Sequence, residues 1–252
     1  MSFFERHKPI ITILVAIVLM AAIGGVFYVL HQHEEVKDME NVGVVTEKTL
    51  TDFSDSIKTG DIQSAKKYCT PEGCDQLVLD SLDVTIFKQT LLDGLGIKEE
   101  ELPEDSKAYL TSLQDTLKTK VVTDVTYDIS QMEVEQKTDE GYVVTIPVTL
   151  TGCGSLNGID FSAEMSYATH SMMDYATGNQ DALMNHNDVF GEEGVRGLLR
   201  QQTYANLFSA MLTKAQALEP TPKNYQVKIF VTKGKDGEYS FAKIAGAEEV
   251  LE

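Results

Sequence analysis

A long apolar stretch near the N-terminus limits what this chain can fold into. Residues 9–30 read PIITILVAIVLMAAIGGVFYVL and contain no charged side chain. As a helix rising about 1.5 Å per residue, the stretch is roughly 33 Å long, which matches a bilayer hydrocarbon core of about 30 Å. The sequence therefore predicts a transmembrane helix over residues 9–30.

The charges on either side of this stretch predict its orientation. Residues 1–8 contain Arg6 and Lys8, whereas residues 31–40 are rich in Asp and Glu. Because Lys and Arg concentrate on the cytoplasmic side, we expect a cytoplasmic head at residues 1–8 and an extracytoplasmic C-terminal domain. A cleaved signal peptide, cut near the small-x-small sequence Ala22-Ile23-Gly24, is the alternative. The apolar run exceeds the usual ~7–15 residues of such a peptide, so we favour an uncleaved single-pass anchor in the cell membrane.

The composition is that of an acidic protein with a folded domain. Hydrophobic residues make up 42% of the chain, enough for a core, and the formal net charge is −18 at pH 7. Because nucleic acids and anionic lipid surfaces are bound through Lys and Arg, this charge argues against nucleic acid as a partner and against adsorption to anionic lipid. The partners that we expect are the bilayer, through the anchor, and an unknown envelope protein or ligand.

Helices are expected at the start of the extracytoplasmic domain, which we place at residues 45–252, after a charged juxtamembrane spacer at residues 31–44. Three apolar segments with helical spacing follow one another. Gly60 and Gly94 are typical helix ends, and Pro103 suits a first helical turn. The apolar positions of the three segments are Leu50, Phe53 and Ile57, then Leu79, Leu82 and Ile86, then Leu110, Leu113 and Leu117.

The apolar spacing then changes to alternation, which is typical of strands. It predicts a first hairpin, with a bulge near Ser130 and with Pro147 marking an edge strand or a bulge, and a second hairpin that turns at Asp236-Gly237. Between the hairpins we expect helices over about residues 160–176 and 192–218. The strand positions predicted to face inward are Val121, Val125, Tyr127, Ile129, Val144, Ile146, Val148, Val227, Ile229 and Phe241.

This order predicts an α+β domain, in which a curved antiparallel sheet is backed by helices and a helical insert separates the two hairpins. The segments SIKTGDIQSAKKYC (56–69) and YQVKIFVTKGKDGEYSFAKI (225–244) are similar to the start and the last strands of nuclear-transport-factor-2-like (cystatin-like) cones. Over roughly residues 43–246 the chain resembles a family of Gram-positive extracytoplasmic surface proteins of unknown function with this domain. The resemblance implies a cone and brings no catalytic residues. The chain departs from it by its insert at about 160–218 and by having no lipidation Cys.

The three cysteines raise the question of a metal, a redox motif or a disulfide. Cys69 and Cys74 flank Thr-Pro-Glu-Gly, which reads as a tight turn. Their spacing is not CxxC, and no second pair of ligands completes a zinc site. An extracytoplasmic compartment permits disulfides, so we expect a Cys69–Cys74 staple that stabilises the domain by ~2 kcal/mol. Cys153 is then left as a small buried residue or as a site of pairing between chains.

No motif for catalysis, for a cofactor or for a metal is present. A catalytic base in a cone needs a carboxylate in an apolar pocket, but Asp124 and Asp128 alternate onto the face that we predict to be wet. Tyr127 is expected to be a packed core residue, and His170 and His186 to be surface or satisfied residues. The segment NHNDVFGEEG (185–194) is rich in oxygen ligands but misses the calcium-loop pattern, so we expect a solvated loop.

Two classes of function remain. The first is a membrane-anchored binding or interaction module of the bacterial cell envelope, without a cofactor. The alternative is a small membrane-tethered hydrolase or isomerase of the cone fold. An inward carboxylate in a closed cavity would favour the enzyme, whereas a shallow groove, an exposed sheet edge or an exposed apolar patch would favour the module. The sequence favours the module.

Overall fold

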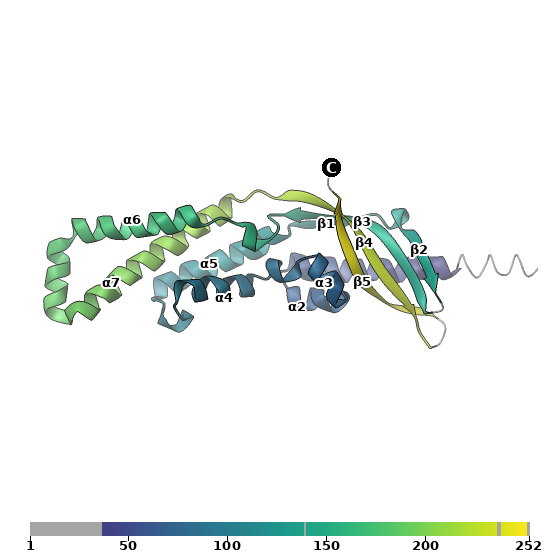
Figure 1. Ribbon diagram of the computed structural model, residues 1–252, viewed down its shortest axis with the longest axis horizontal. Helices are drawn as coiled ribbons and strands as arrows, with labels where there is room; N and C mark the ends of the chain where they lie inside the picture. The colour runs from purple at the N-terminus through teal and green to yellow at the C-terminus, as the bar shows by residue number, and fades with distance from the viewer. Residues whose placement is uncertain (1–36, 139, 236–237, 251–252) are drawn as a thin grey trace, which may run out of the picture.

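The computed structural model describes residues 37–138, 140–235 and 238–250, without the side chains of Ser240 and Phe241 (Figure 1). The predicted head at residues 1–8 and the predicted anchor at residues 9–30 lie outside this part. Among the helices of the described part, none is both long enough and apolar enough to cross a membrane.

The domain is α+β and contains a five-stranded antiparallel sheet, as predicted from the change of period. The strands run in the order β1-β3-β4-β5, and β2 pairs with β3 on the same side as β1. Their bounds are Asp124–Tyr127 (β1), Glu133–Thr138 (β2), Gly141–Gly152 (β3), Thr221–Lys233 (β4) and Tyr239–Val250 (β5).

One face of the sheet forms its side of the core, because alternate residues of the long strands are apolar. Opposite residues meet in register, with Val144 beside Ile229 and Ile146 beside Val227. All four are buried, as are Val125, Val148 and Val231. Tyr127 and Ile129 are only partly buried against the core. The side chain of Phe241 is outside the described part, but Ala242 and Ile244 are buried, after a bulge between β4 and β5 that shifts the alternation.

The first edge of the sheet is broken where the sequence predicted a bulge. A 3-10 turn, η4 (Ile129–Gln131), separates β1 from β2. Pro147 of β3 lies opposite this gap, because β1 pairs with β3 only as far as Val148 and the pairing with β2 starts at Thr145, opposite Glu133. The prediction that Pro147 marks an edge strand was wrong, since β3 is central and pairs with β4 along its length. A residue without an N–H is tolerated here, where the ladder is interrupted on one side.

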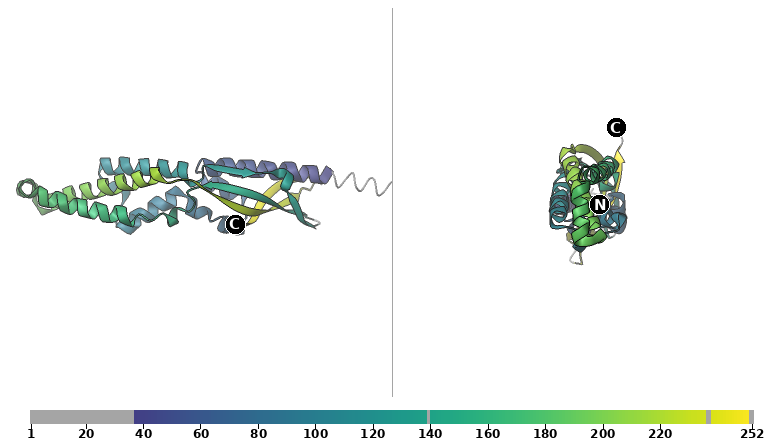
Figure 2. Two further views of the ribbon diagram at one scale, coloured as in Figure 1. Left: turned by 90° about the horizontal axis from the view of Figure 1, so that it is seen from above. Right: turned by 90° about the vertical axis from the view of Figure 1, so that its left-hand side faces the viewer.

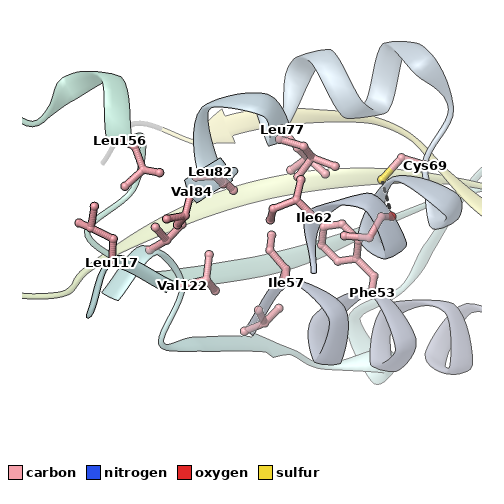
Figure 3. Close-up of a cluster of buried hydrophobic side chains, with 14 of the residues drawn as sticks. Phe53, Ile57, Ile62, Cys69, Leu77, Leu82, Val84, Leu117, Val122 and Leu156 are labelled. Atoms are coloured by element: carbon pink, nitrogen blue, oxygen red, sulfur yellow. Dashed lines mark hydrogen bonds between the residues drawn. The ribbon is translucent and has the colours of Figure 1, made fainter. Parts of the chain in front are cut away.

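A helix over residues 37–58 packs along the sheet (Figure 1). It buries the predicted stripe Leu50, Phe53 and Ile57, of which Figure 3 labels Phe53 and Ile57. Its first two turns take up residues 37–44, which the sequence assigned to a spacer. Val42 is fully buried, so the folded domain begins before residue 45. Short elements follow: α2 (Ile62–Ala65), η1 (Lys66–Tyr68), α3 (Pro71–Gln76) and η2 (Leu79–Leu82).

The opposite half of the molecule is helical. It contains α4 (Val84–Leu95), η3 (Glu99–Glu101), α5 (Glu104–Val121), η5 (Leu156–Gly158), α6 (Ser162–Gly178) and α7 (Gln180–Ala217). Asp83 caps α4, and Gly96 ends it in the left-handed region. The stripe Leu110, Leu113 and Leu117 of α5 is buried as predicted.

The molecule is elongated, with the sheet toward one end and a helical hairpin at the other (Figures 1 and 2). We call α6 and α7 together the arm. It is the predicted helical insert, and it connects β3 to β4, whose neighbouring ends pair at Gly152 and Thr221. The arm therefore leaves the sheet and returns to it at one place.

Candidate interaction surface

The carboxylates that would have supported catalysis are on the surface. Asp124 and Asp128 are both exposed. The Ser130 hydroxyl and backbone N–H donate to Asp128 and hold the pKa of its carboxyl below its usual value. Tyr127 is half-buried, and its hydroxyl lies 2.8 Å from Thr51 Oγ1. Asp128 thus caps η4, and Tyr127 connects β1 to the 37–58 helix.

Cys69 and Cys74 lie together, but as free thiols. The segment between them is not a bare turn: Thr70 caps α3, Pro71 opens it, and Cys74 is part of it. Burial, followed by the neighbouring Cys74 thiol, raises the pKa of Cys69 well above its ordinary value. Cys153 is free as well. A buried, protonated thiol is a poor nucleophile, so Cys69 is not suited to catalysis.

No group of three or more His, Cys, Asp and Glu residues in the described part is arranged to hold a metal. His170 lies on α6 and is exposed. The predicted loop at 185–194 is largely helical, which the sequence missed; it belongs to α7, and the ring of His186 packs 4.5 Å from that of Phe190. His7, His31 and His33 lie outside the described residues.

A small pocket of about 140 Å³ opens between η2, the end of α5 and the ends of β3, β4 and β5. Its charged pair is already satisfied, because Lys223 Nζ lies 3.0 Å from Glu249 Oε1. Burial raises the pKa of Tyr225 nearby. At its rim, Val78 adopts φ 52°, ψ 38°, a left-handed conformation that is costly for a β-branched residue. The pocket is smaller than the ~300–1,000 Å³ of ordinary ligand sites.

The two sheet edges are poor sites for strand addition. On β5, the backbone N–H of Thr70 donates to Ile244 O and Gln76 Oε1 accepts from Ala247 N–H, so segment 69–76 covers this edge. At the other edge, β2 is fully exposed, but it carries charged residues and a register shift between Val134 and Gln136. Charge and irregularity are the usual means by which edges resist pairing.

A long part of the arm has very few buried residues. Between Ser162 and Arg200 only Ala168 is buried. Farther along α7, Leu207, Phe208, Met211 and Ala215 are buried, and α7 packs beside α5. The base of the arm is thus part of the core, and its distal half extends beyond it (Figures 1 and 2).

Polar contacts hold the base of the arm. Lys214 Nζ of α7 donates to Asp160 O and pairs with Glu164 of α6 at 3.2 Å. Lys120 Nζ of α5 donates to the carbonyls of Gln216 and Leu218 at the end of α7. A cation that caps the terminal carbonyls of a helix satisfies groups that the helix itself leaves open. Both ends of the arm are therefore fixed.

A glycine sets the shape of the distal half. Gly191 interrupts α7 with φ 71° and ψ −179°, a conformation essentially restricted to glycine. As a result, the first part of α7 crosses from the end of α6 to the longer second part (Figure 1). A Cβ on Gly194 would lie 2.4 Å from Phe190 Cβ, so the chain folds closely back on itself after the kink.

We define the arm tip as residues 173–193. It carries four large apolar side chains that are more than half exposed: Met173, Met184, Val189 and Phe190, at 56%, 67%, 71% and 63%. Apolar exposure of this kind, concentrated in one short stretch, marks interaction sites more often than single scattered residues do. Sequence reasoning missed the tip, because it read the segment at 185–194 as a solvated loop, whereas the structure makes it largely helical.

Searches against models of protein families, curated proteins and solved structures match nothing to this chain.

Proposed function

We propose that this chain is a single-pass, membrane-anchored interaction module of the bacterial cell envelope, and that the arm tip is its binding surface. Residues 9–30 anchor it with the N-terminus in the cytoplasm, and the α+β domain lies outside. The exposed apolar tip of the arm carries the proposal. Such a tip adds little to the stability of the domain, since burial is what makes apolar side chains stabilising.

The arrangement of the domain supports this use of the arm. The 37–58 helix and the broken sheet edge lie at the end of the molecule opposite the arm (Figure 2). With an anchor preceding residue 37, the arm would point away from the membrane, toward partners in the envelope. The alternative, a tethered hydrolase or isomerase, has less support. Lys223 and Glu249 of the small pocket pair with each other, as do Lys214 and Glu164 of a larger open hollow of about 660 Å³ between α6 and α7.

Cross-linking in intact cells tests the proposal. A photoreactive amino acid replaces Phe190, and in a matched control it replaces Val134, which is 42% exposed on the sheet edge. We expect discrete protein adducts from position 190 that are missing from position 134, each identified by mass. Identical adducts from both positions, or none from position 190, would contradict a binding role for the tip.

The topology needs its own test. In cells stripped of their wall, external protease should digest the domain from residue 31 onward while the protein stays with the membrane fraction. A soluble form beginning near residue 25 would instead indicate a cleaved signal peptide.

In the same compartment we expect the neighbouring thiols of Cys69 and Cys74 to be oxidised to a disulfide by a thiol–disulfide exchange partner, which takes up the two electrons. Protein purified without reductant should then show only Cys153 reacting with a thiol reagent. Labelling of Cys69 and Cys74 in that sample would exclude the staple.

A further inference from the structure

The inner face of the sheet carries polar and charged side chains at one end. Side chains of β4 alternate between the two faces of the sheet, and Val227 is buried in the core. Tyr225 and Lys223 therefore lie on that same inner face. Glu249 of β5 is opposite Tyr225 in register, so its side chain lies on the inner face as well. The side of the sheet that forms the core thus ends in a lysine, a tyrosine and a glutamate.

These three side chains line the small pocket of about 140 Å³. Apolar lining comes from Leu77, Leu82 and Val122, which Figure 3 labels, and from Leu150. A single water needs ~10–15 Å³ of such space, so the pocket has room for roughly ten non-hydrogen atoms. The pocket is therefore suited to a small molecule with its charges at one end and an apolar group at the other.

Two backbone features shape this pocket. Gly152, at the end of β3, lies so near the end of α5 that an added Cβ would be 2.0 Å from Val121 O. At the rim, Val78 is the one non-glycine residue of the described part with a positive φ, and its carbonyl oxygen accepts from the Ser81 hydroxyl at 2.8 Å. Strained conformations of this kind concentrate at active sites and ligand sites. Ligand binding at the pocket would account for the strain at Val78.

The charged groups of the pocket are able to receive a ligand. Lys223 Nζ lies 3.0 Å from Glu249 Oε1, and the two side chains are 47% and 39% exposed. An ion pair this exposed contributes little to stability, so opening it costs little. Because the two partners have opposite charges, a ligand that replaces the pair must bring both an anionic and a cationic group. Burial, followed by the charge of Glu249, raises the pKa of Tyr225, so its hydroxyl stays protonated and can donate to an anion.

We propose that this pocket binds a small zwitterion, namely an α-amino acid with a small aliphatic side chain. The carboxylate of the ligand pairs with Lys223 and accepts from Tyr225, its ammonium group pairs with Glu249, and its side chain lies on the apolar lining. A ligand with only one charge would leave the opposite partner without a hydrogen bond, which is costly. The inference goes beyond the proposed function, since it adds a small-molecule site to a domain whose proposed binding surface is the arm tip.

Isothermal titration calorimetry of the full-length protein in phosphatidylcholine nanodiscs tests the ligand class, with empty nanodiscs as the background. The probes are the two enantiomers of alanine, propionate, which is alanine without its ammonium group, and ethylamine, which is alanine without its carboxylate. We expect saturable binding of at least one enantiomer, with a micromolar to millimolar Kd. Propionate and ethylamine should bind about tenfold more weakly or not at all, because each lacks a hydrogen bond to a charged group. Tryptophan, which is too large for the pocket, should not bind.

Matched variants locate the site. Lys223→Met should abolish the preference for alanine over ethylamine, and Glu249→Gln should abolish the preference for alanine over propionate. The control is Lys228→Met, because Lys228 pairs with Glu135 at 3.1 Å and is 53% exposed, but lies on the opposite face of the same strand. Lys228→Met should leave both preferences unchanged. Circular dichroism checks that each variant is folded.

Three results would overturn the proposal. The first is that neither enantiomer of alanine binds saturably to the native protein. The second is that propionate or ethylamine binds as tightly as alanine, which would indicate a site for a single charge. The third is an unchanged preference in Lys223→Met, or the same loss in Lys228→Met, either of which would place the ligand elsewhere. The first two results need no variant, so the test stands even where a variant does not fold.

Discussion

The sheet and the arm are built from similar numbers of apolar residues but use them in opposite ways. In β3, Tyr142, Val144, Ile146 and Val148 all face the core and are at most 4% exposed. In the distal half of the arm, Met173, Met184, Val189 and Phe190 are more than half exposed. The sheet therefore contributes to the stability of the domain through its buried face, whereas the distal arm adds little stability and exposes its apolar side chains to solvent.

This difference teaches where the molecule can tolerate change. A residue that packs on every side transmits any loss of volume to its neighbours, whereas a residue with one side in water does not. The arm is also expected to open locally at a lower free energy than the sheet, because few buried contacts hold it.

The largest contrast should come from truncating apolar side chains in the two regions. Ile146→Ala or Ile229→Ala removes a fully buried side chain, and we expect a loss of about 2–5 kcal/mol in the free energy of unfolding. Met173→Ala, at an exposed arm position, should change it by no more than about 0.5 kcal/mol. Urea midpoints of the full-length protein in neutral detergent measure both. Equal losses would show that the arm is as tightly packed as the sheet.

A smaller contrast is expected between two glycines of α7. Gly191→Ala forces a residue with a Cβ into φ 71°, at a cost of about 1–3 kcal/mol that falls on the arm. Gly197 is an ordinary helical glycine with no atom within 4 Å of an added Cβ, so Gly197→Ala should stabilise the helix by about 0.5–1 kcal/mol.

The hydrogen-exchange rates of the amides of residues 162–205 measure the effect of both substitutions. We expect faster exchange in Gly191→Ala and slower exchange in Gly197→Ala, with the sheet amides unchanged. A change of the same size in the sheet would show that the arm and the sheet unfold as one unit.

Acidification should change the free energy of unfolding less than the substitutions above, and by similar amounts through the sheet end and through the base of the arm. Backbone and side-chain hydrogen bonds from Ser64, and from Ser162, hold the pKa values of Asp61 in the sheet end and of Asp160 at the base of the arm below the ordinary 3.8. The stabilising contribution of a carboxylate with a depressed pKa is present above its unfolded pKa and is lost as pH falls through the folded value.

We therefore expect stability to be flat with respect to these groups above about pH 5 and to fall slightly below about pH 4. Asp61→Asn and Asp160→Asn should each reduce the acid-side slope of the urea midpoint against pH. An unchanged slope in both variants would show that the caps are not formed in solution.

The buried faces of the strands could be predicted because side chains alternate between the two faces of a strand, which gives the apolar residues a period of two. Val144, Ile146, Val227 and Ile229 were all assigned correctly. The helices of the arm were predicted from helical spacing, which is also a local signal. Their approximate bounds agree with α6 and with the second part of α7. The predicted start of the folded domain, at residue 45, was too late because of one buried residue. The charges of residues 31–44 suggested a spacer, although Val42 is buried there.

The candidate surface could not be predicted, and the reason is physical. Met184, Val189 and Phe190 have the residue types of a core, and only tertiary structure decides whether a neighbour covers them. Gly191 was the one local signal, since a glycine within an apolar helical pattern can mark a kink. The segment around it was read as a solvated loop because it is rich in oxygen ligands but misses the calcium-loop pattern, whereas the structure makes it helical on either side of the glycine.

The pairing of Gly152 with Thr221 has a consequence for the order of folding. The long ladder between β3 and β4 is closed by a connection that spans residues 153–220. Had those residues been an unstructured loop, closing it would delay the ladder, since the entropic cost of closure precedes the contacts that repay it. An α-helical hairpin forms through near-neighbour contacts and brings its two ends together as it forms. The arm thus shortens the conformational search that precedes pairing of β3 with β4. We expect the base of the arm, around Phe161, Leu207 and Phe208, to be structured in the folding transition state before β3 and β4 pair fully.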